Sequence, residues 1–157
     1  MRRTIKHTPP RLHRIFDAYS FPLYFLTICT FRKQRVLATP SVHAAFKQYA
    51  RTGEDTGRAL VGDYVLMPDH IHLFVRLDRA ENLGVWVRGL KRKLTPAIRA
   101  QGATDVWQPG FFDHLLRSGE NYADKWAYVR QNPVRAGLVA KPDEWSFAGR
   151  ISILDRV

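Results

Sequence analysis

Residues 64–75 read Tyr-Val-Leu-Met-Pro-Asp-His-Ile-His-Leu-Phe-Val, two apolar runs of β-forming residues on either side of a Pro-Asp pair. The pattern predicts two antiparallel strands, 59–66 and 70–77, joined by the tight connection 67–69. Successive side chains of a strand point to opposite faces, so His70 and His72 share one face while Ile71 points to the other. The rest of the chain can be interpreted outward from this pair of strands.

Two imidazoles on one face of a strand make half of a metal site. Neutral imidazole is a common metal ligand, and a strand holds His70 and His72 at a fixed spacing. Two histidines separated by one residue also occur on half-exposed strands that bind nothing, because motifs this short match by chance. A metal-site interpretation therefore needs a third ligand from elsewhere in the chain.

The flanking sequence predicts an α+β fold. Helix 82–101 contains Pro96, which predicts a kink or an earlier end. The order of elements is compatible with a ferredoxin-like antiparallel sheet with helices packed on one face. The other expected elements are a buried strand over 21–31, a helix that starts at Pro40 with Ser41 as N-cap, a strand after Pro109-Gly110, and a helix from Ser118 to about Gln131.

The chain of 157 residues has the size of one domain, which we place at 21–157. A basic N-terminal arm, 1–20, precedes it. The longest apolar segment, 21–31, is far shorter than the roughly 20 residues that span a bilayer, so no membrane span is expected. No secretory signal is recognisable, and Cys29 is the only cysteine, which favours a reduced, cytoplasmic setting.

A formal net charge of +11 and a pI near 10.3 indicate an anionic partner, nucleic acid first and acidic lipid second. The alternative is a basic protein that its charge merely keeps soluble. In helix 82–101, Arg88, Arg92 and Arg99 lie opposite the apolar stripe. They form either a solvated face or a face that follows phosphates.

The expected helix from Ser118 carries the remaining candidates. Tyr122, Trp126 and Val129 form a stripe that should face the core. Tyr128 and Asn132 lie one turn apart on a second stripe, with Asp124 one turn earlier. An Asn oxygen is an acceptable ligand for Mg²⁺ or Mn²⁺. Alternatively, Tyr128 is a packing aromatic with its hydroxyl in water, and Asn132 is a helix C-cap before Pro133.

Residues 67–73 and 128–139 resemble the two signature blocks of the HUH single-strand DNA transposases with one catalytic tyrosine, closest to the REP-associated tyrosine transposases. The resemblance also takes in 107–114 and Leu116-Arg117, and it spans most of the chain from Tyr24 to Ser146. Asp69 stands where many members of that family have Asn. Neither residue is expected to be a direct metal ligand, so the departure is minor.

The resemblance implies a metal-dependent transposase acting on single-stranded or hairpin DNA. Its metal, Mg²⁺ or Mn²⁺, would be held by His70, His72 and Asn132. Tyr128 would be the nucleophile, giving a 5′-phosphotyrosine intermediate and a 3′-hydroxyl before the strands are rejoined. Lys125 is a candidate for helping Tyr128 to ionise, and His114 for touching DNA. The alternatives are a nucleic-acid-binding module without catalysis, and a hydrolase in which the metal activates water.

The expected DNA contacts are basic residues, because unpaired strands are held by cations that follow phosphates and by aromatic rings on which bases stack. Through its DNA the protein would be associated with the nucleoid. A monomer is favoured slightly over a dimer, and the sequence leaves open both the DNA sequence and whether Tyr128 acts in its own subunit. The candidates are Arg2, Arg3, Lys6, Arg11 and Arg14 of the arm, with Arg88, Arg92, Lys93, Arg117 and Arg130 of the domain.

Overall fold

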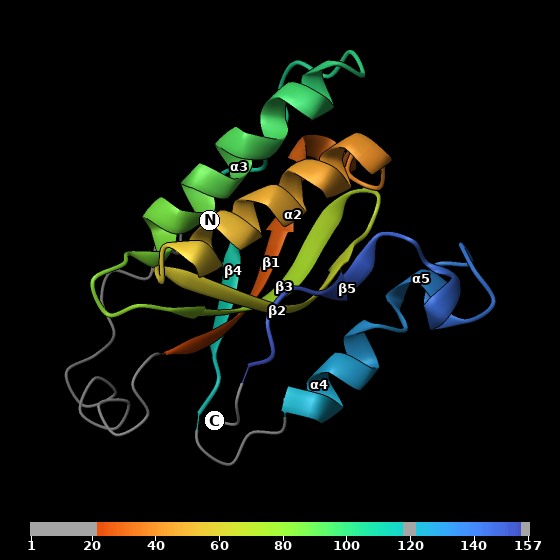
Figure 1. Cartoon of the computed structure of the whole chain (residues 1–157). Helices are drawn as coiled ribbons and strands as arrows, with labels where there is room; N and C mark the ends of the chain where they lie inside the picture. Colours follow the sequence, from red (N-terminus) through yellow and green to blue (C-terminus); the bar gives the residue numbers. More distant parts are fainter. Residues whose placement is uncertain (1–21, 118–121, 155–157) are drawn as a thin grey trace.

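The computed structural model describes residues 22–117 and 122–154, and the arm residues and Ser118 lie outside these ranges. Five antiparallel strands form one sheet in the order β4-β1-β3-β2-β5. Two long helices, α2 (Pro40–Asp55) and α3 (Leu83–Arg99), cover one face, and α4 (Tyr122–Val129) lies across the other (Figure 1). The α+β antiparallel fold is confirmed, but the helices are not confined to one face as expected, because α4 packs on the second face through Tyr122 and Trp126. The strands are β1 Leu23–Cys29, β2 Ala59–Leu66, β3 His70–Leu77, β4 Phe112–Leu115 and β5 Ala148–Arg150.

The strand pair that the histidine motif predicts is confirmed residue for residue, with β2 and β3 joined by 67–69. The Met67 amide donates to the His70 carbonyl at 2.8 Å and closes the connection. The Pro68 carbonyl accepts from the amides of Val36 and Leu37 at 2.9 and 3.0 Å, which ties the connection to the segment after β1. The start of β3 is therefore fixed from both sides.

The alternation along β3 separates a packing face from a polar one. Ile71, Leu73 and Val75 are fully buried in the main core under α2 and α3. His70 and His72 lie on the opposite face, where Phe74 packs under α4. The predicted sharing of a face by the two histidines follows from this register.

Helix α2, Pro40–Asp55, begins one residue earlier than its expected cap. Thr39 is the N-cap, with extended backbone angles and a side chain that accepts from the Val42 amide at 3.3 Å, so the assignment of the cap to Ser41 is wrong. Proline suits the first helical position because its missing N–H has no partner there in any case. Thr39, immediately before Pro40, is thus the residue that satisfies an amide of the first turn.

Helix α3, Leu83–Arg99, is capped by Asn82, whose side chain accepts from the Val85 amide at 3.1 Å. It continues past Pro96 and ends two residues before its expected end. Gly89 lets α2 approach, because a Cβ at that position would clash with the Tyr49 hydroxyl oxygen. That hydroxyl donates to the Trp86 carbonyl at 2.8 Å.

The expected helix to Gln131 is two helices, α4 Tyr122–Val129 and α5 Asn132–Arg135. Pro133 explains the break, because it has no N–H to continue the helical hydrogen bonds of α4 but is well accommodated in the first turn of a new helix. The expectation that Tyr128 and Asn132 share one helical stripe is therefore wrong. Two short 3₁₀ helices, Phe31–Lys33 and Pro142–Glu144, complete the described elements.

The expected inward stripe of α4 is confirmed. The Tyr122 ring packs on Phe74 with 4.0 Å between centroids, and Trp126 contacts the same ring edge-on at 6.4 Å. Val129 is 5% exposed and packs against Val65. Both ends of α4 are thus seated on the histidine-bearing face.

A buried polar cluster anchors the first turn of α4 to the sheet. The Tyr122 hydroxyl donates to Asp63 Oδ2 at 2.8 Å and accepts from the Asp63 amide at 2.9 Å. Arg150 of β5 pairs with the same carboxylate, through Nε at 3.0 Å and Nη2 at 3.2 Å. Burial raises the pKa of Tyr122, so the phenol stays protonated and remains a donor. Asp63 is 4% exposed, so these hydrogen bonds replace water around its carboxylate.

Tyr122→Phe should lower the free energy of unfolding by about 1–3 kcal/mol, because it leaves the buried Asp63 amide without its acceptor. Urea denaturation measures the change. The matched control is Tyr128→Phe on the same helix, whose side chain is 68% exposed and which should unfold like the unsubstituted protein. Equal stability of the two variants would contradict an anchoring role for the cluster.

Candidate active site

The two histidines meet at the start of β3. Their ring centroids are 4.7 Å apart and the rings are nearly perpendicular, at 77°. The His70 side chain is 26% exposed, and His72 is also partly buried. The pair therefore lies at the surface of the sheet, within reach of a ligand.

Each imidazole is oriented through its Nδ1 atom. His70 Nδ1 donates to Asp69 Oδ1 at 2.7 Å, and His72 Nδ1 is 2.9 Å from the Thr27 hydroxyl on β1. Metal-binding histidines usually hold one ring nitrogen in a hydrogen bond of this kind, which fixes the ring and leaves the other nitrogen for the metal. Nε2 of each ring is the nitrogen that remains for that purpose.

His72 is held in the neutral form that a metal ligand requires. Burial of the ring, followed by repulsion from His70 and from the cations Arg135 and Lys125, lowers the pKa of His72 to about 4. A hydrogen bond with the Leu26 backbone acts in the opposite direction and is outweighed. At neutral pH the imidazole therefore carries a lone pair rather than a second proton.

The lowered pKa of His72 predicts a pH-dependent stability. The unfolded chain, with an ordinary pKa of 6.5, takes up a proton at His72 before the folded protein does, so stability is full above pH 6.5 and falls as pH drops toward 4. Between pH 7.5 and pH 5 the loss from this group is about 2 kcal/mol. Urea unfolding in EDTA should show a smaller loss for His72→Gln, and equal losses would contradict the assignment.

Arg135 of α5 joins the tyrosine to the asparagine. Its guanidinium lies over the Tyr128 ring, with 4.1 Å from Cζ to the centroid. Nη1 donates to the Tyr128 carbonyl at 2.9 Å, and Nη2 donates to Asn132 Oδ1. The candidate nucleophile and the candidate third ligand are therefore held by one cation, across the break between α4 and α5. The Tyr128 side chain itself is 68% exposed.

Two cations connect this group with the histidines. The Lys125 ammonium of α4 lies 4.8 Å from the centroid of Phe25, and that ring stacks on His72 at 5.3 Å with an interplanar angle of 18°. Lys125 and Arg135 both contribute to the lowered pKa of His72. Lys125 of α4 and Arg135 of α5 are thus close enough to the histidine-bearing face to influence His72 electrostatically.

The donor set fits a divalent ion only with help from an amide or from the substrate. Within 22–117 and 122–154, no three His, Cys, Asp or Glu side chains are grouped so that they could hold a metal. Two imidazole nitrogens and the Asn132 oxygen make an incomplete set of the kind that leaves positions open for other oxygen ligands. The Asn132 oxygen already accepts from Arg135, so its second lone pair is the one available to an ion.

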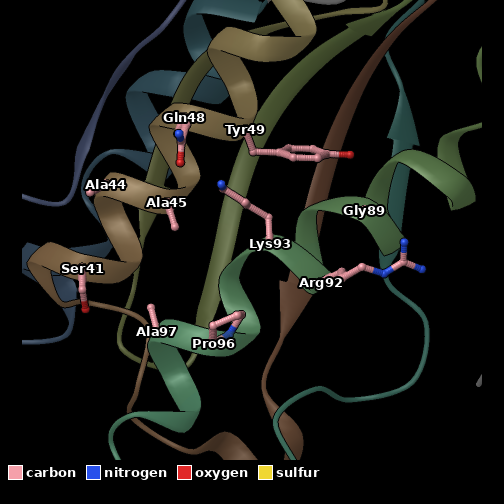
Figure 2. A pocket seen from close by; sticks show the side chains of 10 residues that line it. All are labelled: Ser41, Ala44, Ala45, Gln48, Tyr49, Gly89, Arg92, Lys93, Pro96 and Ala97. Carbon is pink, nitrogen blue, oxygen red and sulfur yellow. The ribbon is translucent and has the colours of Figure 1, made fainter.

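The expected DNA contacts do not gather around the histidines. Arg88, Arg92 and Lys93 lie on α3, on the other side of the sheet, and Arg92 and Lys93 line a groove of about 900 Å³ between α2 and α3. Figure 2 shows Lys93 pointing toward α2 and Arg92 directed away from it. Arg117 is exposed after β4, and Arg130 pairs with Asp143. The arm residues lie outside the described ranges, so all of these contacts stay predictions.

Sequence reasoning missed Thr27 and Arg135. The signal for Thr27 was its place in a strand next to β3, where the register sets it directly opposite His72. The signal for Arg135 was its place in residues 128–139, the second block of the resemblance, seven residues after Tyr128. In the structure its guanidinium lies over the Tyr128 ring across the break between α4 and α5.

No helix of the described residues is both long enough and apolar enough to span a lipid bilayer.

A protein that is provisionally named a REP-associated tyrosine transposase, from Haemophilus influenzae, is 26% identical over 138 residues, covering 80% of this chain and 78% of that protein. The REP-associated tyrosine transposase of Escherichia coli K12 is 29% identical over 90 residues, covering 56% of this chain and 52% of that protein.

Solved structures agree with these relatives. A REP-associated tyrosine transposase bound to a REP hairpin superposes with a TM-score of 0.65 and 25% identity, covering 81% of this chain and 75% of that one. A Deinococcus radiodurans protein provisionally classed as a transposase shares the fold, with a TM-score of 0.50, 16% identity, and coverage of 83% and 97%. The resemblance noted in the sequence is confirmed. Because the model of IS200-like transposases matches residues 20–132, most of the chain, this protein belongs to that family.

Proposed function

We propose that this chain is a metal-dependent transposase that binds single-stranded or hairpin DNA, cleaves one strand through Tyr128 and rejoins strands. One observation carries the proposal: two histidines, each oriented through Nδ1, share a sheet face with the helix that bears an exposed tyrosine. A relative solved with a REP hairpin supports hairpin DNA as the substrate. The net charge of +11 suits such a polyanion.

His70, His72 and Asn132 would hold the divalent ion, Mg²⁺ or Mn²⁺. When bound, such an ion polarises a phosphoryl oxygen and offsets negative charge that develops during displacement. The protein's part is to present Nε2 of both rings, which Asp69 and Thr27 orient, and to keep His72 neutral at the pH of the cell. The hydrogen bonds of His70 to Asp69 and of His72 to Thr27 are suited to orienting the two rings in this way.

Tyr128 would supply the nucleophile. Its phenolic oxygen forms a bond to phosphorus, the bond between phosphorus and the 3′ oxygen breaks, and the released oxygen takes up a proton to become a 3′-hydroxyl. The phenolic proton is lost to solvent. The resulting 5′-phosphotyrosine keeps a phosphodiester, so a 3′-hydroxyl of another strand can attack it and restore the tyrosine without an external energy source. The exposure of Tyr128 leaves it accessible to a strand.

The test is a covalent conjugate between the protein and DNA. The chain is incubated with Mn²⁺ and a pool of labelled REP-type hairpins whose single-stranded flanks are randomised, then denatured and separated. We expect a conjugate that EDTA prevents, whose attached peptide contains Tyr128 and whose attached strand reveals the sequence cleaved. Cleavage without a conjugate would indicate a metal-activated water. Binding without cleavage would indicate a nucleic-acid-binding module, and either result would overturn the proposal.

A further inference from the structure

The sequence block 107–114 has no role in the chemistry described so far, yet the sheet register brings it to the histidine-bearing face. Phe112 of β4 is paired with Thr27 of β1, which is in turn paired with His72 of β3. Directly opposite residues in antiparallel strands project from the same face. Phe112, Thr27 and His72 therefore form one row across three strands.

Neighbouring strands lie about 4.8 Å apart, so two strand spacings place the Phe112 backbone roughly 10 Å from that of His72. Thr27, the residue between them, makes the hydrogen bond that orients His72. β4 is an edge strand of the described sheet. Phe112 thus stands beside the paired imidazoles, on the side where the sheet ends.

The two phenylalanines of this block have opposite environments. Phe111 is 9% exposed and packs into the main core, whereas Phe112 is 57% exposed. The turn before them sets this division: the Lys91 ammonium donates to the carbonyls of Gln108 and Gly110 at 3.1 and 2.7 Å, and Gly110 has φ of 76°, a backbone region that favours glycine. Phe112 is therefore presented outward by a fixed turn.

An exposed ring of this kind is suited to an unpaired nucleobase. Bases stack on aromatic side chains regardless of sequence, while nearby cations hold the phosphates. Lys125 and Arg135 supply such cations on the same face. We propose that Phe112 is a stacking platform for an unpaired base next to the scissile phosphate. This inference rests on the proposed function, because it identifies a part of the substrate that the same site would hold.

The test measures base stacking directly and without cleavage. The probes are hairpins with the sequence recovered from the conjugate. Each probe carries a single 2-aminopurine at one position of the unpaired flanks, and it is titrated with protein in EDTA. At one position adjoining the cleavage point we expect fluorescence quenching that Phe112→Leu abolishes and Phe112→Trp retains. Phe112→Leu should also weaken binding of that hairpin by about 5- to 150-fold.

The controls separate stacking from folding. Val85, on α3 at the far side of the sheet, is 55% exposed, so Val85→Ala loses a comparable exposed apolar group and should change neither quenching nor affinity. Thermal unfolding should be unchanged for Phe112→Leu, since the ring is largely exposed. Its loss of binding would then be a loss of contact with DNA.

The outcomes keep this inference distinct from the proposed function. One outcome is that the unsubstituted protein forms the Tyr128 conjugate, while Phe112→Leu and Phe112→Ala show its fluorescence quenching and its affinity for the hairpin. Phe112 is then not a base platform, and the proposed function stands. If no conjugate forms, the function fails, and the platform proposal fails with it because it names a base beside a scissile phosphate. Quenching lost equally in Phe112→Leu and Phe112→Trp would also overturn stacking on an aromatic ring.

Discussion

His70→Ala should reduce strand cleavage by at least about 100- to 1,000-fold while leaving hairpin binding largely intact. The substitution removes one of two imidazoles that would position the divalent ion, whereas affinity for DNA comes mainly from neutralised phosphates. Cleavage is measured in Mn²⁺ with the labelled hairpin, and binding by anisotropy in EDTA. The two measurements on one variant separate metal chemistry from DNA affinity.

The matched control for His70→Ala is Asp69→Asn. The Asn side-chain oxygen can still accept from His70 Nδ1, so the ring keeps its orientation and most activity should remain. A fall in binding that parallels the fall in cleavage of His70→Ala would contradict the proposed division of roles. So would an Asp69→Asn variant as inactive as His70→Ala, because the carboxylate itself would then be essential.

Tyr128→Phe should eliminate the covalent conjugate and reduce cleavage by at least about 1,000-fold, the scale on which loss of a nucleophile acts in covalent catalysis. The substitution keeps the ring under the Arg135 guanidinium and the backbone contact to Arg135, so the α4–α5 region should stay in place. Binding of the hairpin and thermal stability should be unchanged. Cleavage is followed with and without Mn²⁺ on the recovered hairpin sequence.

The matched control for Tyr128→Phe is Tyr49→Phe, which removes a tyrosine hydroxyl from the α2–α3 side of the sheet. It should form the conjugate normally. Cleavage by Tyr128→Phe at an undiminished rate, with no conjugate, would show that water is the nucleophile. A conjugate that persists in Tyr128→Phe would show that another residue is attached to the DNA.

The sequence predicted the strands better than the helix ends. β2 and β3 could be bounded correctly because alternation and a Pro-Asp connection are local signals that the sheet reinforces. The cap of α2 was misplaced because Thr39 and Ser41 flank Pro40 and carry the same chemistry. The end of α4 was misplaced because the stripe through Tyr128 continues past the residues where Pro133 interrupts the backbone hydrogen bonds.

One part of the candidate site could be predicted from the sequence: His70 and His72 share a face because alternate side chains of a strand point to the same side. The partners that orient them could not be found in the same way, because Thr27 lies 45 residues away and is brought opposite His72 only by the sheet. Arg135 depends on an irregular turn that no periodicity describes. The metal roles of His70, His72 and Asn132 and the nucleophilic role of Tyr128 stay predictions until the experiments above are done.

The sheet divides the molecule into two sides that can be altered separately. The candidate site residues lie on the side of α4, while α2 and α3 close the main core on the reverse side, where the groove of Figure 2 opens. A fluorophore, an affinity handle or a surface attachment placed at exposed positions of α3 would therefore be separated by the sheet from Tyr128 and the phosphotyrosine proposed to form there. Strand exchange could then be watched on immobilised molecules with the reactive side still open to DNA.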